Sequence, residues 1–104
     1  MKYLLCQISF SALVLAQPTM EQARRLALCE AMEREYTYLA DEAARDYVQQ
    51  VAGRMGAARV RIVDEAAAWV DVLPCGLILV TKGFLQRAAS EREVAERIAH
   101  MMGH

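Results

Sequence analysis

The chain has 104 residues, enough for one domain that buries roughly two thirds of the surface its unfolded form exposes. Its 12 Lys and Arg residues nearly balance its 13 Asp and Glu residues, and the two signs are interleaved along the chain. Because no basic stripe forms, we expect no nucleic-acid partner.

Residues 1–16 have the pattern of a secretory signal peptide. One cation, Lys2, precedes an apolar run of about a dozen residues, and Val14 and Ala16 would fill the small-residue positions before a cut at Gln17. We therefore expect a secreted or periplasmic protein whose single domain spans residues 17–104. The alternative is an uncleaved N-terminal helix, which could associate with a membrane but is too short to cross one.

Two helices are expected next. Thr19 and Gln22 form a capping-box pattern that opens a helix from about Met20 to Tyr36. Asp41 can cap a second helix, for which Gly56 is a plausible stop. Within it, apolar residues recur at helical spacing at Ala44, Tyr47, Val48, Val51 and Met55.

The periodicity then changes to two. Val60 and Ile62 alternate with arginines, which predicts a half-exposed strand. The segments "AAWVDVL" and "LILVTKG" predict two further strands joined by a turn, because Pro74 fixes φ and Gly76 permits a positive φ. The apolar run Leu77 to Val80 suits a strand that is covered on both faces.

A short helix around "GFLQRAA" and a second capping box, Ser90 with Glu93, lead into the final helix, "EREVAERIAHMMGH". The predicted fold class is therefore α+β. It comprises two N-terminal helices, a small mixed or antiparallel sheet of about three strands, and a C-terminal helix that carries "HMMGH".

His100 and His104 lie one helical turn apart, so their imidazoles can share one metal ion. Histidines near a helix C-terminus are also favoured by the helix dipole alone. The spacing by itself therefore leaves both interpretations open.

The wider pattern resembles the HtpX and Oma type of gluzincin zinc metallopeptidases, the group that includes the CAAX prenyl proteases. Members typically show a Leu-Pro-Gly-Gly turn, a strand, a Thr-x-Gly-Leu-Leu segment, a helix beginning near Ser-Glu, and then His-Glu-x-x-His. The resemblance covers about residues 30–104. The matching positions are Leu73, Pro74, Gly76, Thr81, Gly83, Leu85, Ser90, Glu91, Ala99, His100, Gly103 and His104.

The resemblance implies that His100 and His104 are the first two zinc ligands. It also implies the N-terminal half of a zincin-like domain, with a sheet whose outer edge pairs with an extended peptide substrate. The sequence departs from the family at Met101, which stands at the position of the general-base glutamate. The family's third ligand, a later glutamate, has no position before the sequence ends at His104.

Two further departures, Asp71 and Cys75, replace an apolar residue and a glycine near the turn, and we expect them to alter the sheet edge.

A positioned general base is worth about 10²- to 10⁴-fold in rate, and a thioether cannot replace it because it carries no proton near neutral pH. The sequence therefore predicts a zinc-metalloendopeptidase-like protein that is proteolytically inactive, a pseudoenzyme. We expect weak zinc binding, because His104 lies at a frayed helix end.

Other functions stay open. The chain could be a peptide-binding or regulatory interaction module, or one half of an oligomeric assembly in which a second copy or a partner chain covers an exposed apolar face. It could also be a gene remnant without a selected role. An active enzyme requires that another subunit supply both a ligand and a base.

The remaining chemistry-bearing residues have simpler interpretations. Cys29 and Cys75 could form a disulfide in an oxidising compartment or stay as two buried thiols. Met101 and Met102 are expected to fill gaps in the core rather than bind copper. Trp69 is expected to be a core residue within a strand. The charged stretches "EREY" and "SEREVAER" are expected to be solvated faces.

Overall fold

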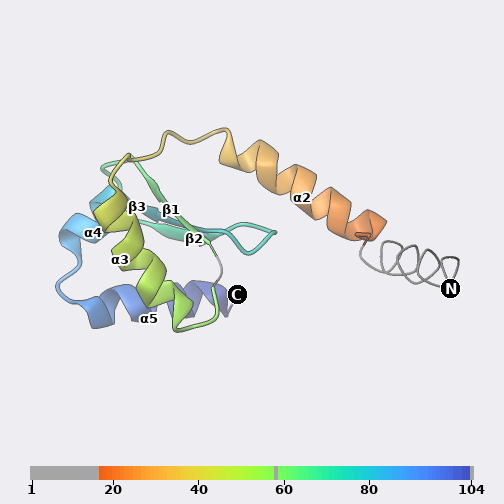
Figure 1. Cartoon of the computed structure of the whole chain (residues 1–104). Helices are drawn as coiled ribbons and strands as arrows, with labels where there is room; N and C mark the ends of the chain where they lie inside the picture. Colours follow the sequence, from red (N-terminus) through yellow and green to blue (C-terminus); the bar gives the residue numbers. More distant parts are fainter. Residues whose placement is uncertain (1–16, 58, 104) are drawn as a thin grey trace, which may run out of the picture.

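The computed structural model describes residues 17–57 and 59–103, and its α+β architecture confirms the predicted fold class. The predicted signal segment, residues 1–16, and the second predicted zinc ligand, His104, lie outside the described residues. In chain order (Figure 1), the elements are α2 (Met20–Glu33), α3 (Glu42–Gly53), β1 (Val60–Val63), β2 (Val70–Val72), β3 (Ile78–Thr81), α4 (Lys82–Arg87) and α5 (Glu91–Met102).

The three strands form one mixed sheet in the order β1-β3-β2. β1 runs parallel to β3, with Val60 opposite Ile78, and β2 runs antiparallel to β3, with Val70 opposite Val80. The β2–β3 connection is the predicted turn, in which Gly76 has a φ of 88°. All four residues of β3 are buried, as expected for a central strand covered on both faces.

One face of the sheet is covered by α3, α4 and α5, and this layer is called the first core. Asp41 caps α3 by accepting from the Ala44 N–H at 3.0 Å, and Ser90 caps α5 by accepting from the Glu93 N–H at 3.2 Å. Both helices then turn their apolar stripes toward the sheet. The first core includes Val48, Val51, Val60, Ile62, Val70, Ile78, Val80, Phe84, Val94 and Ile98.

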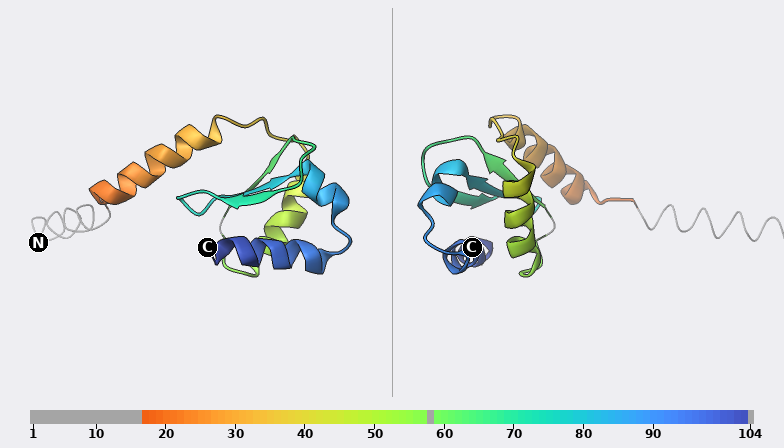
Figure 2. Two further views of the ribbon diagram at one scale, coloured as in Figure 1. Left: turned by 180° about the vertical axis from the view of Figure 1, so that it is seen from behind. Right: turned by 60° about the vertical axis from the view of Figure 1, so that its left-hand side comes forward.

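The opposite face is covered by the last turn of α2 and the segment that follows it, and this layer is called the second core. Cys29 and Met32 of α2 pack there with Tyr36, Tyr38 and Trp69 against the sheet residues Val63, Leu73, Leu77 and Leu79. The rest of α2 extends away from the fold (Figure 2), and Met20, Leu26 and Leu28 are exposed. The second core therefore depends on how the end of α2 is held.

A disulfide holds it. Cys29 in α2 pairs with Cys75 in the β2–β3 turn, with their Cα atoms 5.9 Å apart. The sequence left this pairing open. The structure decides it because the turn brings Cys75 against the buried side of α2, 46 residues away along the chain.

Three local predictions needed correction. α2 ends at Glu33 rather than near Tyr36, because Tyr36 leaves the helix to pack on Trp69, with ring centroids 5.6 Å apart. Trp69 itself precedes β2 instead of lying in it, although it is half-buried in the second core as expected. The capping box at α5 is half formed, because Glu93 accepts from the Ala89 N–H at 2.8 Å instead of from Ser90.

The predicted start of α2 and the predicted stop after α3 are confirmed. At α2, Thr19 and Gln22 make both bonds of the capping box. After α3, the Gly56 N–H donates to Gly53 and the Ala57 N–H donates to Ala52, while Gly56 has a φ of 88°. This is the Schellman arrangement that ends helices at glycine, so Gly56 stops the helix as predicted.

Replacing both cysteines, Cys29→Ser with Cys75→Ser, should lower the free energy of unfolding by about 2–4 kcal/mol, because the closed loop no longer restricts the unfolded chain. Urea unfolding followed by circular dichroism measures the loss. Dithiothreitol should reproduce it in the unaltered protein and have no effect on the double variant. An unfolding midpoint that dithiothreitol leaves unchanged would contradict a stabilising disulfide.

Gly83, in the first turn of α4, lies against the loop that precedes β2. Its N–H donates to the Glu65 carbonyl at 2.9 Å, and a Cβ at this position would overlap the backbone carbonyl of Ala66. Gly83→Ala should therefore cost about 3 kcal/mol of stability, since backbone rather than a flexible side chain must move. Gly53→Ala is the matched control. A Cβ there meets nothing within 4 Å, so its unfolding midpoint should stay the same or rise.

Candidate functional site

Neighbouring residues of the "HMMGH" pattern on α5 differ in their exposure to solvent. Val94 and Ile98 are buried, and Met101, which follows at the same helical spacing, is half-buried against the first core. His100, one residue earlier, is exposed. Met101 therefore packs inward, which confirms the packing role expected for it.

The structure describes one of the two predicted zinc ligands. His100 lies in the last turn of α5, whereas His104 lies outside the described residues. Within residues 17–57 and 59–103, no group of three or more His, Cys, Asp and Glu side chains could hold a metal ion. Zinc bound through His100 and His104 stays a prediction.

β2 is the edge strand next to α5, which packs against it. The Leu73 N–H donates to Leu77 at 2.8 Å, and the Thr81 N–H donates to Trp69 at 3.2 Å, so residues 69, 71 and 73 direct their backbone groups toward β3. The backbone groups of Val70 and Val72 therefore point to the outer edge.

Asp71 changes the hydrogen bonding at this edge. Its Oδ1 accepts from the Val72 N–H at 2.8 Å. A donor that an added strand would use is thereby occupied by the protein's own side chain, one of the ways in which edge strands avoid unwanted pairing.

A mainly apolar cavity of about 640 Å³, whose wall also includes Glu30, Glu33 and Arg59, lies at the end of the β2–β3 hairpin. α2 contributes Leu26 to its wall, the hairpin contributes Val72 and Leu77, and the end of α5 contributes Met102. Met102 is thus 38% exposed rather than packed inside the core.

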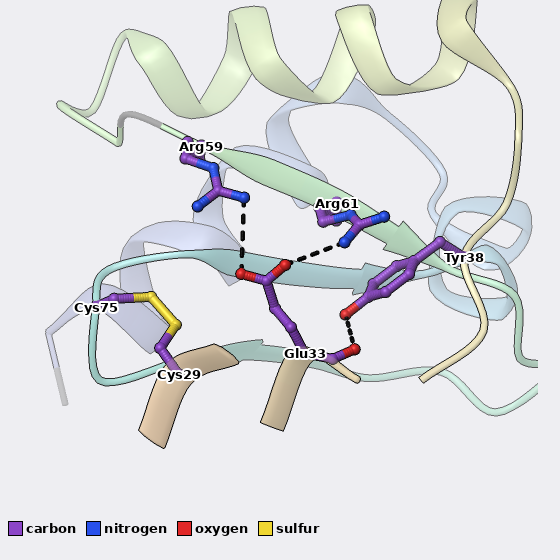
Figure 3. Close-up of a disulfide and its surroundings, with 6 residues drawn as sticks. All are labelled: Cys29, Glu33, Tyr38, Arg59, Arg61 and Cys75. Carbon is purple, nitrogen blue, oxygen red and sulfur yellow. Dashed lines mark hydrogen bonds and ion pairs between the residues drawn. A yellow bond between two sulfur atoms is a disulfide. The ribbon is translucent and has the colours of Figure 1, made fainter. Parts of the chain in front are cut away.

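A cluster of charged and aromatic side chains lies at the end of α2 (Figure 3). The Glu33 carboxylate lies 3.0 Å from Nη1 of Arg61 and 3.6 Å from Nη2 of Arg59, and its side chain is 17% exposed. The Arg61 guanidinium lies 3.5 Å from the centre of the Tyr38 ring, and the Tyr38 hydroxyl donates to the Glu33 carbonyl at 2.6 Å. The expectation that "EREY" is a solvated face is therefore wrong at Glu33.

The electrostatics at Tyr38 follow from its position. Burial raises the pKa of the phenol above its ordinary value of 10.0, and the Arg61 guanidinium, which lowers it, offsets part of that effect. The neutral phenol is therefore favoured in the folded protein, in the form that donates to Glu33. The contribution to stability is present below pH 10 and is lost as the pH rises further.

Sequence reasoning missed the Glu33 group because it treated each charged stretch separately. The available signal was the alternation of Arg59 and Arg61 on one face of β1, which requires an acidic partner if that face is covered. Which acidic residue meets them depends on where α2 ends, and this is a property of the fold.

Comparison of the chain with models of protein families finds no match, and comparison with curated proteins finds none. Among the helices that the structure describes, none is both long enough and apolar enough to span a membrane.

Proposed function

We propose that this chain is a zinc-metallopeptidase-like protein that does not cleave peptide bonds by itself. The observation that carries the proposal is the placement of Met101, whose thioether lies against the first core at the position that resembles the general base. Without a proton-accepting side chain there, hydrolysis would be slower by about 10²- to 10⁴-fold.

The surrounding geometry supports a peptidase-like scaffold. The glycines that match the family pattern each meet a physical requirement: Gly76 adopts a positive φ in the hairpin turn, and Gly83 leaves room for the Ala66 carbonyl. Thr81, also part of the pattern, accepts from both the Trp69 and Phe84 N–H groups at 3.1 Å, which joins the end of β3 to the residue before β2 and to the start of α4.

Zinc, in this proposal, is held by His100 and His104. Binding would be weak, because two imidazoles are fewer than the three protein ligands that catalytic zinc usually takes. Residues 1–16 would direct the protein out of the cytoplasm. The Cys29–Cys75 disulfide supports this part, since such bonds persist in oxidising compartments.

The test measures bound zinc after dialysis together with cleavage of casein. The unaltered protein should retain little zinc and His100→Ala should retain less, with no cleavage by either. Met101→Glu supplies the missing base, and Met102→Glu is the matched control one residue away. If Met101→Glu alone gains chelator-sensitive cleavage, the scaffold lacked only its base. A purified monomer of the unaltered protein that cuts casein and stops with a chelator would refute the proposal.

A second candidate function, capture of an extended peptide without cleavage, is favoured by the outer edge of β2. Val70 and Val72 present their backbone groups there, and the apolar cavity near Met102 could receive a side chain. The same edge could instead pair two copies of the chain and cover their exposed apolar surface.

Asp71→Ala tests whether the outer edge of β2 binds a peptide or a second copy of the chain. Because the substitution frees the Val72 N–H, an unstructured peptide should bind about fivefold more tightly, or self-association should increase. Asp71→Asn keeps an acceptor oxygen and is the control. Fluorescence anisotropy and size-exclusion chromatography, with and without chelator, measure the two effects. Equal behaviour of both variants and the unaltered protein would exclude β2 as a docking edge.

A further inference from the structure

The outer edge of β1 lies on the opposite side of the sheet from β2 and carries a second set of outward-facing backbone groups. The Ile78 N–H donates to the Arg59 carbonyl at 3.1 Å, so residues 59 and 61 direct their backbone groups toward β3. Those of Val60 and Ile62 therefore point away from the sheet.

Most of this edge is already paired. The Val60 N–H donates to Oε1 of Gln49 at 3.0 Å, and the Ile62 carbonyl accepts from the Leu39 N–H at 2.8 Å. The Val60 carbonyl and the Ile62 N–H have no hydrogen-bond partner among residues 17–57 and 59–103. Ile62 is 2% exposed, and a buried N–H without a partner is both costly and rare, which indicates a place for a bound acceptor.

A pocket of about 280 Å³ opens at this edge. Arg45 of α3, Arg61 of β1 and Arg59, which precedes β1, line it, and no acidic side chain of the described residues does. Its volume is just below the range of about 300–1,000 Å³ that is typical of small-molecule sites, so it suits a ligand of amino-acid size.

The arginines keep donors for such a ligand. Arg61 is held between the Glu33 carboxylate and the Tyr38 ring, and it gives Glu33 one N–H bond, from Nη1. Figure 3 shows Arg59, which immediately precedes the same strand, also directed at Glu33. Since a guanidinium has five N–H donors, neither cation is saturated by one carboxylate.

The Val60 carbonyl and the Ile62 N–H indicate which kind of ligand the pocket binds. In parallel strand pairing, one residue donates its N–H to the carbonyl before a given position and accepts from the N–H after it. Val60 and Ile62 flank Arg61 in this way, so a single amino-acid residue is complementary to them. Three arginines favour a carboxylate as the accepting group.

We propose that this pocket binds the carboxy-terminal residue of a peptide, or an N-acylated amino acid. The ligand N–H donates to the Val60 carbonyl, and its α-carboxylate accepts from the Ile62 N–H and the arginine side chains. No covalent step is involved.

The test is a titration of the full chain, labelled with ¹⁵N, with N-acetylalanine. The Ile62 amide signal should shift. N-acetylalanine amide, which lacks the charge, and acetate and inorganic phosphate, which lack the N–H, should each bind at least about tenfold more weakly, the loss of one charge-assisted hydrogen bond. A short peptide ending in alanine distinguishes the two sources. Tighter binding of the peptide indicates a polypeptide terminus, and equal binding indicates the small acid.

Arg45→Gln should weaken N-acetylalanine binding about tenfold. It should not disturb folding, because the side chain is exposed and, among the described residues, forms an ion pair with the neighbouring Asp46 only. Arg92→Gln, which removes the same charge from an exposed site on α5, is the control. The proposal is overturned if the Ile62 amide does not shift, if the amide or phosphate binds as tightly as the acid, or if both variants behave alike. Because this edge includes neither α5 nor β2, its failure would leave the peptidase-like proposal intact.

Discussion

The fold depends on burying the central strand, β3, from both sides. Four consecutive residues of this strand are inaccessible to solvent, so two separate layers must cover them. α3, α4 and α5 provide one layer through a continuous apolar core. The other layer is thin, because α2 contributes its last turn alone.

The thin layer explains why covalent and ionic links gather at one place. The disulfide from Cys29 and the pairing of Glu33 with Arg59 and Arg61 hold the same turn of α2 over the sheet. The half-buried Glu33 carboxylate needs such partners, because removing it from water without them would cost more than the packing gains. The aromatic side chains of Tyr36 and Trp69 fill the remaining space.

Because both faces of the sheet are covered, a ligand can reach the sheet at its two edges. α5 packs beside β2, and the exposed His100 and inward Met101 belong to that side of the molecule. The edge of β1 is instead surrounded by arginines from β1 and α3. The two edges thus differ in chemistry: at β2, Asp71 occupies the outward Val72 N–H beside a mainly apolar cavity, and at β1 the pocket is lined by three arginines.

The sequence by itself determined the local structure. Capping by Thr19, Asp41 and Ser90, the stop at Gly56 and the turn at Gly76 each involve residues a few positions apart, so their signals could be read directly. Periodicity identified β1 and predicted that Met101 or Met102 packs inward, and a continuous apolar run identified the buried strand β3. The tertiary structure decided the disulfide between Cys29 and Cys75, the end of α2, the pairing of Glu33 with Arg59 and Arg61, and the arginine-lined pocket at β1. These features join residues far apart along the chain, and their geometry depends on how the layers meet on the sheet, which no local pattern specifies.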